Sequence, residues 1–270
     1  MGRKKIYLMF IAASLALSML IWGCGESKHS ADQGEDTTIT VAATSMPADS
    51  LTAADLPLDI GSRLVFASNT PGKPVDVSFT LEGPWNFSSG PNTMTLNMTM
   101  VAPEAAYSAE EFPDANVAVL SSWSPGAEGL EYNFQNKDEA AWRAFGKSTE
   151  KSRTIIYSTP SRALIFPASV GNRWLESYNE IEDGKTVEIT SENLVVARNT
   201  LTLPAGDFDA FLLQTRVSAR RSGITNTTWD YTWFVPGIGR AAEIISEPNE
   251  PKETFTRARA FYRLKSYMIP

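Results

Sequence analysis

A strict alternation of apolar and polar residues constrains the fold of this chain more than any other feature of its sequence. The residues from Thr93 to Val101 read Thr-Met-Thr-Leu-Asn-Met-Thr-Met-Val, and Val75 to Leu81 alternates in the same way. Successive side chains of an extended strand point to opposite faces, so each segment presents one apolar face and one polar face. The pattern predicts β-strands that are buried on one side.

Similar segments continue almost to the C-terminus, and Gly, Pro, Asn or Asp separates them, as in Glu182–Lys185 and Pro204–Asp207. Such short connections favour antiparallel hairpins. We predict an all-β fold with at most one or two short helices, in which a curled antiparallel sheet forms an open barrel or a sandwich. The further predicted strands are Leu130–Phe134, Arg153–Tyr157, Arg173–Glu180, Lys185–Thr190, Leu194–Leu203, Phe208–Ala219, Thr227–Phe234, Arg240–Ser246 and Thr254–Tyr267.

One segment of the chain favours a helix. Asn136 offers an N-cap and Glu139 follows three residues later, which is the spacing of a capping box. Trp142 and Phe145 would share one face of this helix, and Gly146 would end it.

The N-terminus indicates export. Arg3, Lys4 and Lys5 precede an uncharged run that ends just before Cys24, the only cysteine of the chain. This arrangement is typical of a secretory signal peptide, here residues 1–23. The residues Leu20-Ile21-Trp22-Gly23 resemble the lipobox that precedes the acylated cysteine of bacterial lipoproteins. The alternatives are an uncleaved transmembrane helix and a chance cysteine after an ordinary signal peptide.

Lipidation of Cys24 would make a membrane the first partner of the chain. Two or more acyl chains anchor a protein stably, because each buried CH2 contributes roughly 0.8 kcal/mol. Gly25 follows the cysteine, where enteric lipoproteins retained in the inner membrane have aspartate. If the source is Gram-negative, the outer membrane facing the periplasm is therefore favoured.

The composition of the mature chain divides it into two parts. Residues 24–55 lack aromatic side chains and are predicted to be a flexible tether, whereas residues 56–270 contain every tryptophan except Trp22 and are predicted to form a single antiparallel β domain. Removing residues 1–23 leaves 21 basic and 31 acidic residues, a net charge near −10. Nucleic acid and anionic lipid headgroups are thus excluded as partners.

Two short segments of the β domain resemble each other. Residues 57–63 and 167–173 share Pro, an aliphatic residue, Gly and Arg at equal spacing, and each leads into a predicted strand. Two similar half-sheets or recurrent turn chemistry would both explain this echo.

Three motifs carry a resemblance to a known family. They are Pro167-x-x-Val170-Gly171-x-x-Trp174, Leu203-Pro204-Ala205-Gly206-Asp207-Phe208-Asp209-Ala210, and Trp233-Phe234-Val235-Pro236-Gly237-Ile238-Gly239. Over about residues 157–245 the chain resembles the TapB-like family of uncharacterised exported bacterial proteins and lipoproteins. The resemblance implies a curled antiparallel sheet of the kind used by periplasmic carriers and apolar-ligand binders, and no established activity.

Common catalytic and metal-binding side chains are missing from residues 56–270. His29 is the only histidine and lies in the predicted tether, as does Cys24. Catalysis by Ser-His-Asp or Cys-His groups is therefore excluded, and so are the usual zinc, copper and haem ligands. We expect no catalytic residue, no metal and no cofactor.

Carboxylates could still act as a pair. Acidic residues gather at two predicted turns, where solvated charge is the default interpretation. The alternative is a carboxylate-dependent glycan hydrolase or glycan-binding module of the cell envelope, with two acids about 5 to 10 Å apart in a cleft. The acids concerned are Glu180, Glu182, Asp183, Glu188, Asp207 and Asp209.

Aromatic residues form the best candidate binding site. Trp229, Tyr231 and Trp233 alternate along one strand and share a face, and Trp174 with Tyr178 has the same type of spacing. The stripe is core if another layer covers it, or it lines an apolar groove if the sheet is open. The leading hypothesis is an envelope lipoprotein that binds an apolar ligand or an envelope protein without catalysis.

Overall fold

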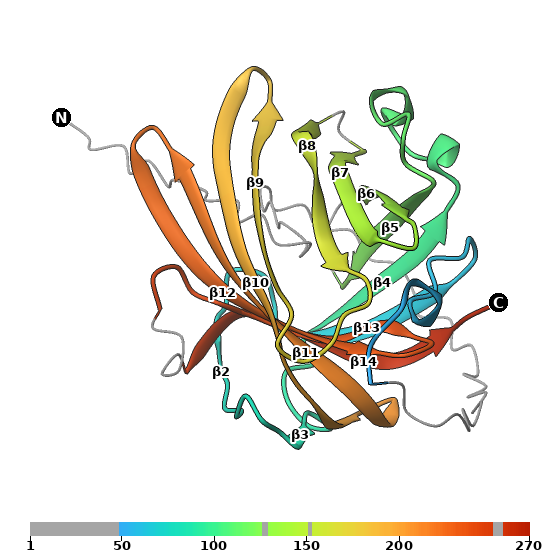
Figure 1. Ribbon diagram of the computed structural model, residues 1–270, viewed down its shortest axis with the longest axis vertical. Coiled ribbons are helices and arrows are strands. Elements are labelled where there is room, and N and C mark those ends of the chain that lie inside the picture. Colours follow the sequence, from blue (N-terminus) through green and yellow to red (C-terminus); the bar gives the residue numbers. More distant parts are fainter. Residues whose placement is uncertain (1–48, 126–128, 151–152, 251–255) are drawn as a thin grey trace.

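The computed structural model describes residues 49–125, 129–150, 153–250 and 256–270 (Figure 1). Nearly all of them lie in or between β-strands, so the all-β prediction is confirmed. The strands are β1 Arg63–Ser68, β2 Val75–Asp76, β3 Trp85–Asn86, β4 Met94–Val101, β5 Val117–Ser124, β6 Glu131–Lys137, β7 Ala141–Thr149, β8 Thr154–Ile165, β9 Arg173–Glu182, β10 Lys185–Leu203, β11 Gly206–Arg221, β12 Ile224–Val235, β13 Gly239–Ser246 and β14 Arg257–Met268. The helices of these residues are the 3-10 turns η1 Ala53–Asp55, η2 Pro103–Ala105 and η3 Ala109–Glu111.

Twelve of the strands form a closed antiparallel barrel. β1 and β4 to β14 follow one another in chain order around the barrel, and β1 pairs with β14 to close it, with Phe66 opposite Leu264. β2 adds to β14, and β3 lies parallel to the end of β10. Closure pairs the backbone groups that an open sheet of this size would leave unpaired at its two edges.

The hairpin predictions hold at both quoted turns. Asp183 and Gly184 connect β9 to β10 with positive φ angles of 48° and 71°. Pro204 and Ala205 connect β10 to β11, which begins at Gly206 with φ 130°. The two strands predicted at Lys185–Thr190 and Leu194–Leu203 are one strand, β10, with a bulge between Val195 and Ala197. The strand predicted at Val75–Leu81 contains only the two residues of β2.

The predicted helix that begins at Asn136 and ends at Gly146 is wrong. These residues form the hairpin of β6 and β7, and the polar residue that organises its turn is Asp138, which lies between the expected cap Asn136 and Glu139. Asp138 Oδ1 accepts hydrogen bonds from the amides of Ala140 and Ala141 at 2.8 and 2.9 Å. Gly146 lies within β7 at φ 149°, where a Cβ atom would approach the Ile155 carbonyl oxygen to 2.2 Å. Glycine is needed there for close backbone approach within the sheet.

The first described residues close one end of the barrel. Leu51 forms a two-hydrogen-bond bridge with Ala168, with N–O distances of 2.9 and 2.8 Å, and Lys137 Nζ donates to the carbonyl oxygens of Ala53 and Leu56. We call residues 49–62 the plug, and this end of the barrel the plugged end. Residues 49–55 were predicted to be tether, and the structure corrects this boundary, because Leu51 is buried in the folded unit.

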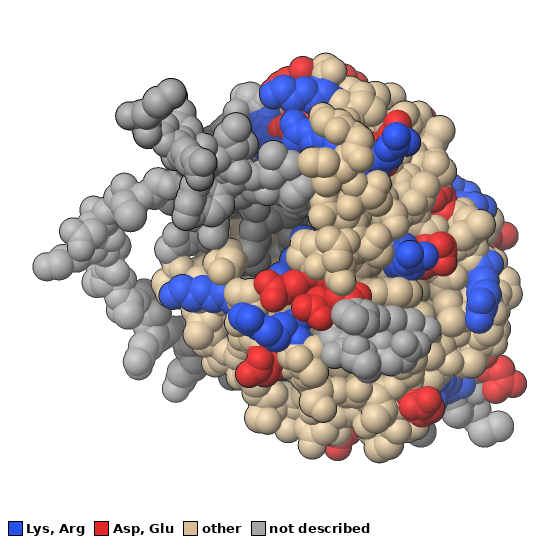
Figure 2. All heavy atoms as spheres, turned by 90° about the vertical axis from the view of Figure 1, so that its left-hand side faces the viewer, with Lys and Arg blue, Asp and Glu red and all other residues tan. Residues whose placement is uncertain are grey.

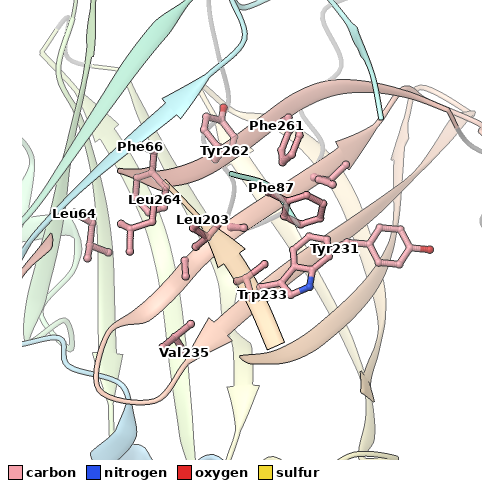
Figure 3. Close-up of a cluster of buried hydrophobic side chains, with 14 of the residues drawn as sticks. Leu64, Phe66, Phe87, Leu203, Tyr231, Trp233, Val235, Phe261, Tyr262 and Leu264 are labelled. Atoms are coloured by element: carbon pink, nitrogen blue, oxygen red, sulfur yellow. The ribbon is translucent and has the colours of Figure 1, made fainter. Parts of the chain in front are cut away.

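The two largest apolar clusters of the described residues pack against the barrel wall. At the plugged end, Leu51 and Leu56 pack against Trp142, Phe211 and Phe234 inside the barrel. On the outside, the segment that carries β2 and β3 crosses the outer face of β12 to β14 (Figure 1). We call this segment, residues 75–88, the strap. Figure 3 shows the second cluster, in which residues of β12 and β14 gather with Phe87 of the strap.

No helix in the described part of the chain has the length and apolar character needed to cross a membrane.

Candidate functional site

The aromatic stripe of β12 is core. Tyr231 and Trp233 are completely buried, because Phe79 packs edge-on against both rings at 4.9 and 5.5 Å and Trp85 also covers Trp233. Phe87 packs against Trp233 as well (Figure 3). The strap supplies all three covering rings. The alternative of an open apolar groove along this stripe is therefore wrong in this structure.

The remaining candidate residues lie outside the fully buried part of that stripe. Trp229 is half-buried and stacks with the Arg216 guanidinium at 5.7 Å from the ring centroid. Trp174 and Tyr178 belong to β9 and point to the other side of the wall, into the barrel, where Tyr178 borders a cavity. The five residues thus lie on two faces of the sheet. Residue spacing identifies the residues that share a face within one strand, but not which face of the barrel they occupy.

The interior of the barrel carries the polar face of β12. Thr228, Asp230 and Thr232 alternate with the aromatic stripe and are buried at 2%, 2% and 8% exposure. Neighbouring strands contribute further buried polar side chains to the described interior, namely Ser121, Glu131, Gln135, Lys147, Ser161, Glu180, Ser191, Asn193, Arg240 and Glu243. Burial of so many polar groups requires internal partners, since each unpaired group costs roughly 1–3 kcal/mol.

Between β8 and β9, the barrel wall is held by backbone hydrogen bonds over only part of its length. Their backbone ladder covers two rungs and ends at Tyr157–Glu180. Beyond it, side chains bridge the strands: Arg162 Nε donates to Glu176 Oε1 at 2.6 Å, and Trp174 Nε1 donates to the Arg162 carbonyl oxygen at 3.0 Å. We call this stretch the seam, and it comprises residues 158–162 and 174–179.

A local irregularity of β8 explains the seam. Against β7, the partner of Gly146 is Ile156 and the partner of Ala144 is Ser161, so β8 contains extra residues between these positions. They include Pro160, which has no amide to donate to a ladder. Ser158 compensates in part, because its hydroxyl accepts the Asn179 amide at 2.9 Å.

A cavity of about 40 Å³ lies behind the seam. A polar cavity of this size holds roughly three water-sized groups. Hydroxyl, amide and charged side chains make up most of its lining, with Phe234 and Leu213 as its larger apolar members. The polar lining residues are Tyr157, Ser161, Arg162, Tyr178, Ser191, Asn193, Thr215, Asp230, Thr232, Arg240 and Glu243.

Opposite charges meet at the far wall of the cavity. Arg240 Nη1 lies 3.3 Å from Glu243 Oε2, and Thr232 Oγ1 donates to Glu243 Oε1 at 3.5 Å. Burial raises the pKa of Glu243 above its ordinary value, although Arg240 acts in the opposite direction. The sequence analysis did not predict the pair of Arg240 and Glu243, which follows the motif that ends at Gly239. No regular spacing in the sequence marks charged residues that pair on a buried strand.

A second buried charged group lies at the end of the β8–β9 ladder. Burial raises the pKa of Glu180 to about 6, while Lys147 and Arg153 oppose this shift and Glu131 adds to it. Lys147 Nζ lies 3.8 Å from Glu131 Oε2, and both side chains are buried. The pKa of the Tyr157 hydroxyl is also raised, first by burial and then by the nearby tyrosine and carboxylates.

The acids predicted as a possible catalytic set do not converge. Glu180 points into the barrel, whereas Glu188 pairs across the ladder with Asn179 and is exposed beside Arg220 on the outside. Glu182 is paired with Arg153, and Asp209 is paired with Arg198 at the other end of β10. In the described ranges, no three His, Cys, Asp or Glu side chains are grouped to hold a metal ion.

Charged side chains of both signs are intermixed on the face shown in Figure 2, where acidic and basic groups lie side by side. The described surface carries cross-strand ion pairs, such as Arg216–Glu192 at 3.2 Å. Exposed pairs of this kind stabilise a fold by only about 0–1 kcal/mol. Cys24, its signal peptide and residues 24–48 of the predicted tether lie outside the described residues.

Comparisons with known proteins give two structural likenesses. No family model matches the chain, and no curated protein matches it. One similar solved structure is an inferred lipoprotein from Parabacteroides distasonis, with 12% identity, a TM-score of 0.42 and coverage of 79% of this chain and 97% of that chain. Another is an inferred exported protein with a YmcC-like fold from Bacteroides fragilis, with 12% identity, a TM-score of 0.36 and coverage of 79% and 98%. The TapB-like resemblance stays a prediction from the sequence.

Proposed function

We propose that this chain is an exported lipoprotein, anchored to an envelope membrane through an acylated Cys24, whose barrel binds a small hydroxyl-bearing solute without catalysis. The anchor rests on the sequence: a basic start, an uncharged run and a single cysteine after Leu20-Ile21-Trp22-Gly23. The binding role rests on the barrel interior.

The polar cavity behind the seam is the observation that carries the binding role. Its lining offers hydroxyl groups from Ser161, Ser191, Thr215 and Thr232 and an amide from Asn193. These groups donate and accept hydrogen bonds, as hydroxyl groups of a solute do. Since both arginines of the cavity have a carboxylate beside them, Glu176 at Arg162 and Glu243 at Arg240, a neutral solute matches the site better than an anion.

An apolar ligand does not match this interior. The polar groups of the cavity already bond one another, as Thr215 Oγ1 does to Asn193 Oδ1 and Thr232 Oγ1 does to Glu243 Oε1, and an apolar ligand would face them without adding a hydrogen bond. The apolar clusters of the barrel are already packed, with Trp233 enclosed by three aromatic rings of the strap.

The absence of catalysis is part of the proposal. The folded domain contains neither histidine nor cysteine, because His29 and Cys24 both precede it. The turn acids face different sides of the wall, so they do not form the paired carboxylates that a glycosidase places about 5 to 10 Å apart. Glu180 and Glu188 illustrate this separation.

Titration of the purified barrel with glycerol, the smallest triol, tests the binding role by calorimetry. We expect saturable binding that Thr232→Val weakens several-fold, because this near-isosteric change removes a cavity hydroxyl. Thr190→Val is the matched control, since Thr190 is exposed on the outer face of β10. Native mass spectrometry of the protein from its own envelope adds a direct readout. Absence of both saturable binding and any co-purifying solute would contradict the proposal.

A further inference from the structure

The sequence echo of residues 57–63 and 167–173 corresponds to two matching turns. Ser62 N donates to the Asp59 carbonyl oxygen at 3.0 Å, and Asn172 N donates to the Ser169 carbonyl oxygen at 3.0 Å. The third residue of each turn is glycine with positive φ, 99° at Gly61 and 95° at Gly171. A β-turn with glycine at this position and positive φ has the geometry of type II.

Both turns expose an aliphatic side chain at their second position. Ile60 is 59% exposed and Val170 is 52% exposed. The turn geometry accounts for the glycines, but it does not require a β-branched apolar residue at the tip. An exposed arginine follows three residues later in each case, Arg63 at the start of β1 and Arg173 at the start of β9. The repeated unit is therefore an apolar tip with a cation beside it.

The two turns lie on opposite sides of the plugged end. β1 and β9 are six strands apart in the closed ring of twelve, and both strands begin at this end. Met268, which is 50% exposed, pairs with Arg63 and adds a third apolar side chain beside the first turn. A flat surface at the plugged end would contact Ile60, Val170 and Met268 at the same time.

The chain also leaves the barrel at this end on its way to Cys24. Asp49 is the first described residue, and the plug and the C-terminus lie on the same side of the molecule (Figure 1). Residues 25–48, which belong to the tether predicted from the sequence, separate Cys24 from Asp49, and such a tether would span roughly 27 Å as a random coil. A domain of about 220 residues is roughly 44 Å across, so such a coil rarely lets the opposite end reach the membrane.

We propose that the plugged end faces the bilayer, with Ile60 and Val170 inserted among the lipid headgroups and Arg63 and Arg173 against the phosphates. This orientation rests on the lipid anchor of the proposed function. Aliphatic side chains gain free energy at the membrane interface, and arginine donates bidentate hydrogen bonds to phosphate. The net negative charge of the mature chain favours zwitterionic over anionic lipids as the surface.

Site-specific labelling tests this orientation. Acylation blocks the thiol of Cys24, so a single new cysteine in the full lipidated chain can carry an environment-sensitive fluorophore. We place it at Ile60→Cys, at Val170→Cys, and at Ile224→Cys as the matched control. Ile224 is 50% exposed and begins β12 at the opposite end of the barrel. The protein is reconstituted into phosphatidylcholine vesicles with brominated acyl chains.

Bromine should quench the labels at positions 60 and 170 several-fold more than the label at position 224. In a second variant, Ile60→Ser with Val170→Ser should lower the quenching of a label at Met268→Cys to the level of position 224, without loss of vesicle flotation. Flotation with equal quenching at all positions overturns the orientation alone. Failure of the chain to float overturns the anchor and the orientation together.

Discussion

Tyr157 of β8 and Glu180 of β9 face each other on the last backbone rung before the seam. The barrel wall is held by backbone hydrogen bonds on one side of this rung and by side chains on the other. Glu180 is buried at 3% exposure, so its protonation state bears directly on the stability of the closure.

Glu180 gives the barrel a specific dependence on pH. Its folded-state pKa, raised by burial to about 6, lies above the ordinary 4.5. The folded protein therefore takes up the proton first, and this group adds stability as the pH falls from 6 toward 4.5. Glu180→Gln should raise the free energy of unfolding at pH 7.5 by up to about 2 kcal/mol.

Denaturant titrations between pH 4.5 and 7.5 measure this effect, and the variant should lose the slope that Glu180 contributes. Lys147 and Arg153 keep carboxylate partners in the variant, namely Glu131 and Glu182. Glu188→Gln is the control, because Glu188 is exposed and its loss should change stability little. An unchanged pH profile for Glu180→Gln would show that another group sets the slope.

The seam should open when its side-chain bridges are removed. Glu176 accepts hydrogen bonds from both the guanidinium and the backbone amide of Arg162, so Glu176→Ala leaves that amide without its partner. Loss of about 1.4 kcal/mol corresponds to roughly tenfold faster hydrogen exchange at the amide of Arg162. Glu192→Ala, which removes an exposed ion pair with Arg216, should leave this exchange unchanged. Equal exchange in both variants would indicate that the seam does not depend on Glu176.

Gly146 should tolerate no side chain. In Gly146→Ala the new Cβ would lie 2.2 Å from the Ile155 carbonyl oxygen and 2.7 Å from the Phe112 ring. A cost of about 3 kcal/mol or more in unfolding free energy is expected from this overlap. Gly223→Ala also has positive φ but meets no heavy atom within 4 Å, so it should cost only about 1–2 kcal/mol. Thermal and denaturant unfolding compare the two variants.

The packing of the strap against the barrel should depend on Trp85. This ring is buried at 2% exposure against Trp233, and its Nε1 donates to the Thr80 carbonyl oxygen at 2.7 Å. Trp85→Ala should destabilise the protein by about 3–5 kcal/mol and make residues 75–88 sensitive to limited proteolysis. Leu175→Ala is the control, since Leu175 is 71% exposed. A strap that stays resistant in Trp85→Ala would mean that Phe79 and Phe87 hold it without this ring.

Attachment of the protein to the membrane should depend on Cys24. Cys24→Ser should move the protein from the membrane fraction to the soluble fraction, or stall its maturation with the signal peptide attached. Intact mass of the unaltered protein should show the added acyl groups. An unmodified thiol on a soluble product would refute lipidation.

The alternating pattern was sufficient to predict the antiparallel β fold, because each strand has one face against apolar groups. It did not predict β5, whose first three residues are all buried, so that no strict alternation marks the strand. The hairpin of β6 and β7 was mistaken for a helix because Asn136 and Glu139 have the spacing of a capping box, whereas Asp138 between them accepts the amides of a hairpin turn. Local side-chain chemistry of this kind does not distinguish the two structures.

The site could be predicted only in part. The spacing of Tyr231 and Trp233 correctly placed them on one face, but the strap that covers them lies more than 140 positions earlier in the chain. The cavity combines side chains from β7 to β13, and no single segment contains enough of them to form a motif. Long-range closure of the barrel is what brings them together.

The plug also determines how the protein would respond to mechanical load. A force between an anchored Cys24 and the barrel would enter the folded unit at Leu51, whose bridge to Ala168 consists of two hydrogen bonds. The buried side chain of Leu56 and the lysine contacts of the plug come next along the chain. Pulling would therefore detach the residues of the plug one after another before it disrupted the strands. The plugged end of the barrel would open first, and the detached residues would lengthen the segment between Cys24 and the barrel.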